Sequence, residues 1–280
     1  MVDSLKLSAP GKLNLFLLVL GRRPDGYHRI QTLFQLVDCC DQLEFARGPG
    51  AEIDVLGDFG DLPPADNLIH RAASLLQKTV GHQAGVSISV VKKIPMGGGM
   101  GGGSSDAATT LLGLNELWRL GLGLEDLLAL GSQIGADVPV FIRGKTAWGE
   151  GTGDQLAPLQ LAPKWYLVIV PECRVSTAEI FRHNELTRNS SAIKIADFLR
   201  RDAGNDCEAV VRSLYPEVDN ALKWLSRWAP AKMTGTGSSV FAGFDDRLAA
   251  DKVLSEVPAK WDGFITEGIN DSPLHMELDL

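Results

Sequence analysis

The sequence predicts an α+β fold in two domains, and three observations lead to that prediction. Strand-like and helix-like stretches are mixed along the chain, without the regular alternation of a doubly wound parallel sheet. A glycine-rich loop joins a strand pattern at 86–90 to a helical pattern that starts near Ser104. Two prolines, Pro158 and Pro163, mark residues 155–163 as a hinge. We therefore expect domains at 1–160 and 161–280, with a ligand cleft between them.

The pattern of apolar residues predicts the elements of the first half in turn. Strands are expected at 5–9 and 13–20, separated by Pro10-Gly11, and at 30–37 and 42–46, separated by a turn at 38–41. Helices are expected at 66–80, with Asp66 as a cap, at 104–119 and at 124–134. Further strands are expected at 86–90, 138–142 and 146–148, and a turn at 149–154.

The second half is predicted to begin with a buried strand at 165–170. Ser176 and Glu179 form a capping-box pattern, which predicts the start of a helix. Helical stretches at 206–214 and 217–228, a strand–turn–strand at 231–244, a helix at 246–256 and a strand at 263–269 follow.

Composition and charge bound the kind of protein. The 280 residues are 45% hydrophobic and 22% charged, as in an ordinary globular chain. A net charge of -8, with no basic run, argues against a nucleic-acid partner. The apolar run at 13–20 is too short to span a bilayer, and the four cysteines lack metal or disulfide spacing. We expect a cytoplasmic protein with reduced thiols, no membrane partner, and a monomeric or weakly dimeric state.

The glycine-rich loop is the strongest functional signal. Six of the seven residues at 97–103 are glycine, and Ser104 and Ser105 follow as helix N-cap candidates. A strand, a bare loop and a helix N-terminus in that order form a ready anion site, for which phosphate is the natural ligand.

Other readings of this loop fit less well. A Walker A loop needs a lysine after its last glycine, which is absent here. The dinucleotide fingerprint fits Gly97, Gly99 and Gly102, but its acidic partner about 20 residues later is missing. A flexible linker is the remaining alternative, although linkers are seldom flanked so closely by a strand and an apolar helix.

Lys12 and Asp137 are candidates for a catalytic pair. Each is charged and adjoins an apolar segment, where an unpaired charge is unfavourable. Together they would provide a cation that keeps the aspartate ionised and a carboxylate that orients a hydroxyl. The alternatives are that Lys12 is simply solvated at the end of a strand and that Asp137 is an ordinary turn residue without a function.

Two further loops are candidates for ligand contact. The Pro-Asp-Gly turn at 24–26 places Tyr27 and His28 just past a loop tip, where an aromatic ring is able to stack on a base, or to lie half-buried on an edge strand. The second glycine-serine turn, at 234–239, either faces the first loop across a cleft or is only a hairpin turn.

These clusters, in this order, resemble the GHMP kinases, a family of ATP-dependent kinases that act on small molecules. The segments that carry the resemblance are 9–15, 24–28, 31–35, 66–69, 95–109, 135–141 and 234–237. The resemblance implies an N-terminal domain like domain 2 of ribosomal protein S5, a ferredoxin-like C-terminal domain, and an active site between them. It also implies transfer of the ATP γ-phosphate, with Mg²⁺, to the 2-hydroxyl of a cytidine-diphosphate-linked methylerythritol in non-mevalonate isoprenoid synthesis.

The resemblance also implies residue roles. Lys12 and Asp137 are expected to be the catalytic pair, with Asp137 and Asn14 touching the acceptor. Tyr27 and His28 are expected to hold the cytosine, with Phe181 stacking on its other side and Thr177 nearby. Asn67 and Lys92 or Lys93 are expected near the adenine. The ATP phosphates are expected against Pro95, Gly97, Gly98, Gly99, Gly101, Gly102, Gly103, Ser104 and Ser105, with Mg²⁺ near Ser105 or Asp106.

Three alternatives stay open from the sequence. A kinase of the homoserine or mevalonate type would keep the fold and chemistry but change the acceptor. A non-catalytic nucleotide-binding protein would keep the loop yet need neither Lys12 nor Asp137. An NAD(P)-linked oxidoreductase is disfavoured by the missing acidic partner.

Overall fold

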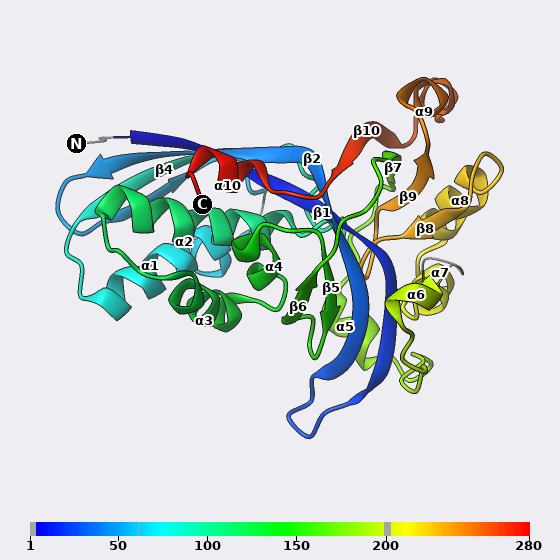
Figure 1. Cartoon of the computed structure of the whole chain (residues 1–280). Coiled ribbons are helices and arrows are strands. Elements are labelled where there is room, and N and C mark those ends of the chain that lie inside the picture. Colours follow the sequence, from blue (N-terminus) through cyan, green and yellow to red (C-terminus); the bar gives the residue numbers. More distant parts are fainter. Residues whose placement is uncertain (1–3, 61, 199–202) are drawn as a thin grey trace.

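The computed structural model describes residues 4–60, 62–198 and 203–280. The central element of the fold is a long antiparallel hairpin of β1 (Ser4–Arg22) and β2 (His28–Gly48). The hairpin crosses from one half of the molecule to the other (Figure 1). The sheet order is β3-β4-β2-β10-β7-β9-β8, so one path of paired strands runs through both halves.

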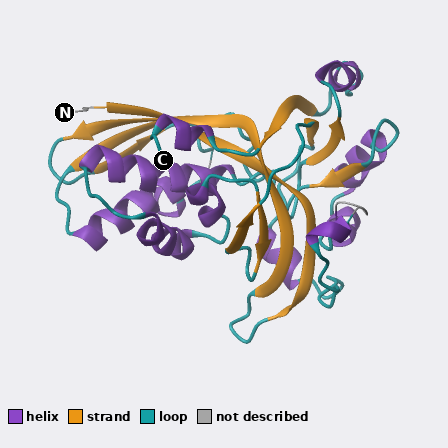
Figure 2. Ribbon diagram, in the orientation of Figure 1, coloured by secondary structure: helices purple, strands orange, loops and turns teal. Residues whose placement is uncertain are grey.

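The first half places helices on one face of a sheet (Figure 2). β4 (Gly85–Val91) pairs antiparallel with β2, and β3 (Ile53–Leu56) pairs parallel with β4. The helices are α1 (Leu68–Val80), α2 (Gly102–Trp118), α3 (Leu124–Ile134) and α4 (Val138–Arg143), after a short 3-10 turn at Pro64–Asp66. β5 (Ala147–Glu150) and β6 (Gln155–Pro158) form a hairpin beside β2.

The second half is built on β7 (Trp165–Val170), β8 (Ala231–Met233), β9 (Val240–Phe244) and β10 (Asp262–Ile269), all in antiparallel pairs. Its helices are α5 (Thr177–Arg182), α6 (Ile195–Phe198), α7 (Glu208–Leu214), α8 (Pro216–Leu225) and α9 (Arg247–Leu254). The chain ends with α10 (Pro273–Glu277). The capping box predicted at Ser176 is confirmed on the serine side, since its hydroxyl accepts from Glu179 N.

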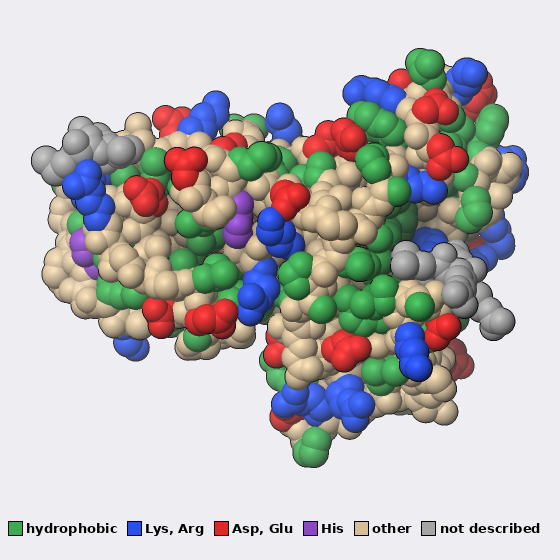
Figure 3. Space-filling view, in the orientation of Figure 1, with side chains coloured by type: hydrophobic (Ala, Val, Ile, Leu, Met, Phe, Trp, Pro, Cys, Tyr) green, Lys and Arg blue, Asp and Glu red, His purple; other side chains and the backbone are tan. Residues whose placement is uncertain are grey.

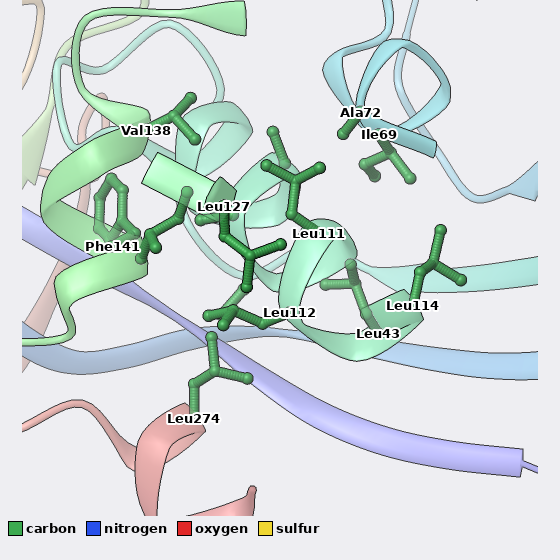
Figure 4. Close-up of a cluster of buried hydrophobic side chains, with 14 of the residues drawn as sticks. Leu43, Ile69, Ala72, Leu111, Leu112, Leu114, Leu127, Val138, Phe141 and Leu274 are labelled. Atoms are coloured by element: carbon green, nitrogen blue, oxygen red, sulfur yellow. The ribbon is translucent and has the colours of Figure 1, made fainter. Parts of the chain in front are cut away.

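Each of the two large hydrophobic clusters contains side chains from both halves of the chain. Leu274 of α10 is buried in the first cluster, with Leu111 of α2 and Phe141 of α4 (Figure 4). Conversely, Leu17 and Val19 of β1 are buried in the second cluster. The division of the chain at 160/161 stays a prediction, and the packing couples the two halves.

Several local predictions were wrong. Residues 138–142 form helix α4 instead of a strand, because Pro139 suits a helix start and Gly144 ends the helix with a φ of 62°. Pro10-Gly11 does not interrupt β1, and no turn occurs at 38–41, because the long hairpin absorbs the irregularity as a register shift between Pro10 and Gly11.

The helix starts also differ from those predicted. Asn67, one residue after the expected Asp66, caps α1, and its Oδ1 accepts from Ile69 N at 2.9 Å. α2 begins at Gly102, so Ser104 and Ser105 lie inside its first turn and do not cap it. The predicted turn at 149–154 begins only after Glu150, where β5 ends.

Candidate active site

A cleft of about 1330 Å³ lies where the two halves meet. From the first half, the glycine loop, the start of α2 and Asp137 line it; from the second half, Thr177, Phe181 and Thr236 do. The β1–β2 hairpin contributes Lys12 from within β1 and His28 from the start of β2. Ligand sites are common in clefts between domains.

The glycine loop takes a conformation that requires its glycines. Gly97, Gly99 and Gly101 have φ values of 72°, 75° and 75°, in the left-handed region. At Gly99, a Cβ atom would lie 2.3 Å from the carbonyl oxygen of Thr234. The loop leads into α2, whose first amides lack partners within the helix and whose N-terminal residues line the cleft. This arrangement suits bound phosphate.

The second glycine-serine turn packs against the first loop. Thr234 Oγ1 donates to Gly99 O at 3.1 Å, and Ser239 N donates to Gly98 O at 3.2 Å. Gly235 and Thr236 line the cleft. The turn therefore joins the antiparallel strands β8 and β9, as in the hairpin reading, and it also meets the first loop in direct contact.

Lys12 and Asp137 meet beside the glycine loop. Lys12 Nζ lies 3.4 Å from Asp137 Oδ2 and donates to Gly99 O at 2.9 Å and to Asn14 Oδ1. Lys12 is 2% exposed, so these acceptors compensate for its loss of water. Asp137 precedes α4, and a third of its side chain faces solvent in the cleft. The pair thus presents a partly free carboxylate whose charge a buried ammonium stabilises.

A buried charge cluster lies at the base of the same loop. Lys92 Nζ forms ion pairs with Asp106, at 2.6 Å, and with Asp41. Asp41 Oδ1 also accepts from the backbone N of Lys93 and of Ile94, at 2.5 and 2.8 Å. Burial raises the pKa of Asp106, Lys92 opposes that change, and Asp41 adds to it. The cluster ties the residues before the loop to the first turn of α2.

The far end of the cleft carries aromatic rings. Tyr27 is 63% exposed. The rings of His28 and Phe181 stack on each other with their centroids 5.2 Å apart, which leaves no room for a base between these two. Thr177 and Thr236 join hydroxyls at 2.8 Å across the same end. A base is therefore unable to stack between these two rings, whereas their outer faces and the exposed Tyr27 ring stay available.

Most residues predicted for the site line this one cleft. They are Lys12, Asn14, Tyr27, His28, Asn67, Lys92, Pro95, Gly97, Gly98, Gly99, Gly101, Gly102, Gly103, Ser104, Asp137, Thr177 and Phe181. Lys93 and Ser105 do not line it; the Ser105 hydroxyl is buried with no hydrogen-bond partner in the described part of the chain. The Lys92 ammonium is held by two carboxylates, and its place beside an adenine stays a prediction.

The sequence prediction missed Asp41 and the arginines of the cleft. Arg174 and Arg182 line the cleft but follow no motif, and Arg22 lines it from just before the Pro-Asp-Gly turn, where no role was predicted for it. Asp41 had a detectable signal, because it is a carboxylate between two apolar strand segments. Its partners Lys92, Lys93 and Ile94, however, lie 51 to 53 positions away in the sequence, so the pairing itself could not be predicted.

The surface adds little to the choice of ligand. On the face drawn in Figure 3, acidic and basic side chains are interspersed. Within the described ranges, no helix combines the length and apolar character needed to cross a membrane. Cys39, Cys40, Cys173 and Cys207 are unpaired, as expected.

Sequence comparisons match both halves of the chain. Family models for the N-terminal and C-terminal domains of GHMP kinases match residues 67–145 and 184–263. The 4-diphosphocytidyl-2-C-methyl-D-erythritol kinase of Tolumonas auensis is 50% identical over 276 residues, which is 99% of this chain and 97% of the relative. The enzyme of that name from Nitrosococcus oceani is 51% identical and covers 95% of both chains.

Comparison with solved structures agrees with the sequence matches. A crystal structure of 4-(cytidine 5'-diphospho)-2C-methyl-D-erythritol kinase superposes with a TM-score of 0.83 at 32% identity, over 95% of this chain and all of that one. Homoserine kinase from Cytophaga hutchinsonii superposes with a TM-score of 0.70 at 19% identity, over 97% and 96%, and shares the fold alone. The predicted two-part α+β fold is confirmed. Family models match both halves of this chain, and relatives that are about 50% identical to it cover nearly its whole length. The chain therefore belongs to the GHMP kinase family.

Proposed function

We propose that the protein is an ATP-dependent kinase that phosphorylates the 2-hydroxyl of 4-diphosphocytidyl-2-C-methyl-D-erythritol, in non-mevalonate isoprenoid precursor synthesis. The identity of about one half to enzymes of that name supports the acceptor. The observation that carries the chemistry is the 3.4 Å contact of Lys12 with Asp137 beside the glycine loop. We place the reaction in the cytoplasm, because unpaired cysteines suit a reducing compartment.

The chemistry follows from these positions. The bond from the γ-phosphorus to its bridging oxygen breaks, a bond to the acceptor oxygen forms, and ADP leaves. The transition state of such transfers is loose, so catalysis rests on positioning and charge stabilisation. Asp137 accepts the hydroxyl proton late, since a carboxylate is a weak base toward a free alcohol. Lys12 orients Asp137 and stabilises negative charge on the transferred group.

Magnesium fits the residues present. Asp106 Oδ1 and Ser105 Oγ are buried and have no hydrogen-bond partner among the described residues. Mg²⁺ commonly binds one or two carboxylates together with substrate phosphates. Asp106, with Ser105 beside it, would hold the ion that ATP brings, and the ion would offset triphosphate charge.

An ADP-release assay on the purified full chain tests the function. We expect turnover with ATP and the diphosphocytidyl acceptor, and none with mevalonate or homoserine. Turnover of either of those two instead would contradict the acceptor. ATP binding without turnover of any of the three would contradict catalysis.

A further inference from the structure

A buried chain of hydrogen bonds leads from Thr32, in β2, to the Lys12 ammonium. The Thr32 hydroxyl donates to the carbonyl oxygen of Phe16 and lies 2.9 Å from Asn14 Nδ2. The other end of the Asn14 amide contacts Lys12 Nζ. Lys12 and Asn14 are each 2% exposed and Thr32 is fully buried, so the protein supplies their hydrogen-bond partners.

The pairing of β1 with β2 brings Thr32 to this place. Asn14 pairs with Phe34 and Leu17 pairs with Thr32, so the register shifts by one residue between the two pairs. Such a bulge locally interrupts the ladder of backbone hydrogen bonds. Phe16 lies within the shifted stretch, and the Thr32 hydroxyl supplies a donor to its carbonyl. A valine of the same shape would leave this buried carbonyl without that donor.

The partners of Thr32 determine which end of the Asn14 amide faces Lys12. A hydroxyl has one proton and a carbonyl oxygen only accepts, so the Thr32 proton lies toward Phe16. Thr32 Oγ1 must then accept from Asn14, which places the amide nitrogen on that side and Oδ1 on the side of Lys12. The opposite orientation would put the NH2 group against the ammonium, with two donors facing each other.

Asn14 Oδ1 is one of three acceptors around the Lys12 ammonium. The others are Gly99 O, at 2.9 Å, and Asp137 Oδ2, at 3.4 Å. An ammonium has three protons, so the acceptors match its donors one to one. With the Asn14 acceptor fixed, the other two protons are directed to the glycine loop and to the carboxylate of Asp137.

We propose that Thr32 is a positioning residue for phosphoryl transfer: its hydroxyl sets the orientation of the Asn14 amide, and the amide holds the Lys12 ammonium against Asp137. The inference rests on the proposed function in so far as kcat is its readout. Thr32 is not part of the cleft lining, so its role is exerted through Asn14 and Lys12.

The first test reads the orientation of the amide directly. In full-length protein with ¹⁵N-labelled asparagine, the Asn14 side-chain signal is assigned by its loss in Asn14→Ala. We expect its NH2 protons to give a stronger nuclear Overhauser effect to the Thr32 methyl group than to the Cε protons of Lys12. The reverse order would overturn the inference. This readout needs no turnover, so it separates the inference from the kinase assignment.

The second test measures turnover after removal of the hydroxyl. Thr32→Val keeps the shape of the side chain but cannot accept from Asn14, so we expect kcat to fall by about tenfold or more. KM for ATP should change by less than about threefold, because the glycine loop keeps its contacts with the turn at 234–239. Thr32→Ser restores the hydroxyl and should keep kcat within about threefold of the wild type. An unchanged kcat in Thr32→Val, or an equal loss in both variants, would contradict the proposal.

Two comparisons separate positioning from packing. Thr146→Val is the matched control, because the buried Thr146 hydroxyl also donates to a carbonyl, that of Ile269 at 2.7 Å, and Thr146 is not part of the cleft lining. It should lower the urea midpoint, as Thr32→Val does, without the loss of kcat. In an Asn14→Ala background, Thr32→Val should lower kcat by less than about threefold further. An undiminished loss in that background, or an equal loss of kcat in Thr146→Val, would show that Thr32 does not act through Asn14.

Discussion

At the residue scale, the site depends on charges that the fold buries and then compensates. Lys12 is almost inaccessible, yet its ammonium has three oxygen partners. A buried charge that loses its partner is strongly destabilising, often by about 3–5 kcal/mol. The sequence made Lys12 and Asp137 candidates for this reason, but only the folded chain shows that they meet.

Because Lys12 and Asp137 act as a pair, their substitutions should not be additive. Asp137→Asn removes the proton acceptor and should lower kcat by about 10²–10⁴. Lys12→Met in that background should then add much less than it costs alone, since it acts through the same contact. Steady-state kinetics of both single variants and the double variant measure this.

Asp54→Asn, on the exposed face of β3, is the control and should leave kcat unchanged. Fully additive losses in the double variant would show that the two side chains act independently.

Asp106 should make the protein less stable as the pH rises. Because its pKa in the fold is raised above the ordinary 3.8, the folded state binds more protons than the unfolded state between those two values. The free energy of unfolding therefore falls as pH increases through that window. Asp106→Asn should remove this loss, so the free energy of unfolding of the variant should fall less between about pH 5 and about pH 8 than that of the wild type.

Urea unfolding at about pH 5 and about pH 8 measures that slope. Asp54→Asn again serves as the control and should keep the wild-type pH dependence. Parallel pH dependence in Asp106→Asn and the wild type would contradict the account of Asp106.

At the scale of elements, the sequence predicts the glycine loop but does not predict that the turn at 234–239 packs against it. The run at 97–103 predicts close approach of a ligand. A strand precedes it and a helix follows it as expected, although α2 starts two residues before Ser104. The partner turn at 234–239 lies more than 130 positions away, and its contact with Gly99 depends on the whole fold. The error at 138–142 is local: short apolar runs fit a strand or a buried helix equally well.

Gly99→Ala should disrupt the loop more than Gly97→Ala. Both positions have positive φ, which costs an alanine about 1–2 kcal/mol. Only at Gly99 does a Cβ atom collide with another segment, the carbonyl of Thr234, whereas nothing lies within 4 Å at Gly97. We expect Gly99→Ala to raise KM for ATP by about tenfold or more.

Gly97→Ala is the matched control, with the backbone cost alone. Thermal unfolding and KM for ATP should differ between the two variants. Equal effects would mean that the contact between the two turns does not shape the loop.

At the scale of the whole molecule, the halves share elements. Strands β1 and β2 belong to both hydrophobic clusters, β10 pairs with β2 and with β7, and α10 returns to the first half. A division by chain position, as the sequence suggests, does not reveal this exchange, because a hydrophobic pattern gives the face of an element and not its partner.

Leu274→Ala should therefore destabilise the first half although it lies near the C-terminus. The side chain is fully buried in the first cluster, so its loss should cost about 2–5 kcal/mol. We expect one unfolding transition at a lower urea midpoint, coincident by circular dichroism and by tryptophan fluorescence.

Leu248→Ala is the control, because Leu248 is 72% exposed and its removal should change stability by less than about 0.5 kcal/mol. Separate transitions for the two probes would show that the halves unfold independently.

The β1–β2 hairpin carries both Lys12 and His28 into the cleft on a single pair of strands, at separate points along the ribbon. Paired strands are stiff along their length, so the hairpin fixes the distance between the site of phosphoryl transfer and the site of the base. Deleting two opposed residue pairs between these points would keep every side chain on its own face of the ribbon. It would also shorten the distance between the two sites, and an acceptor of unchanged length would then reach only one of them.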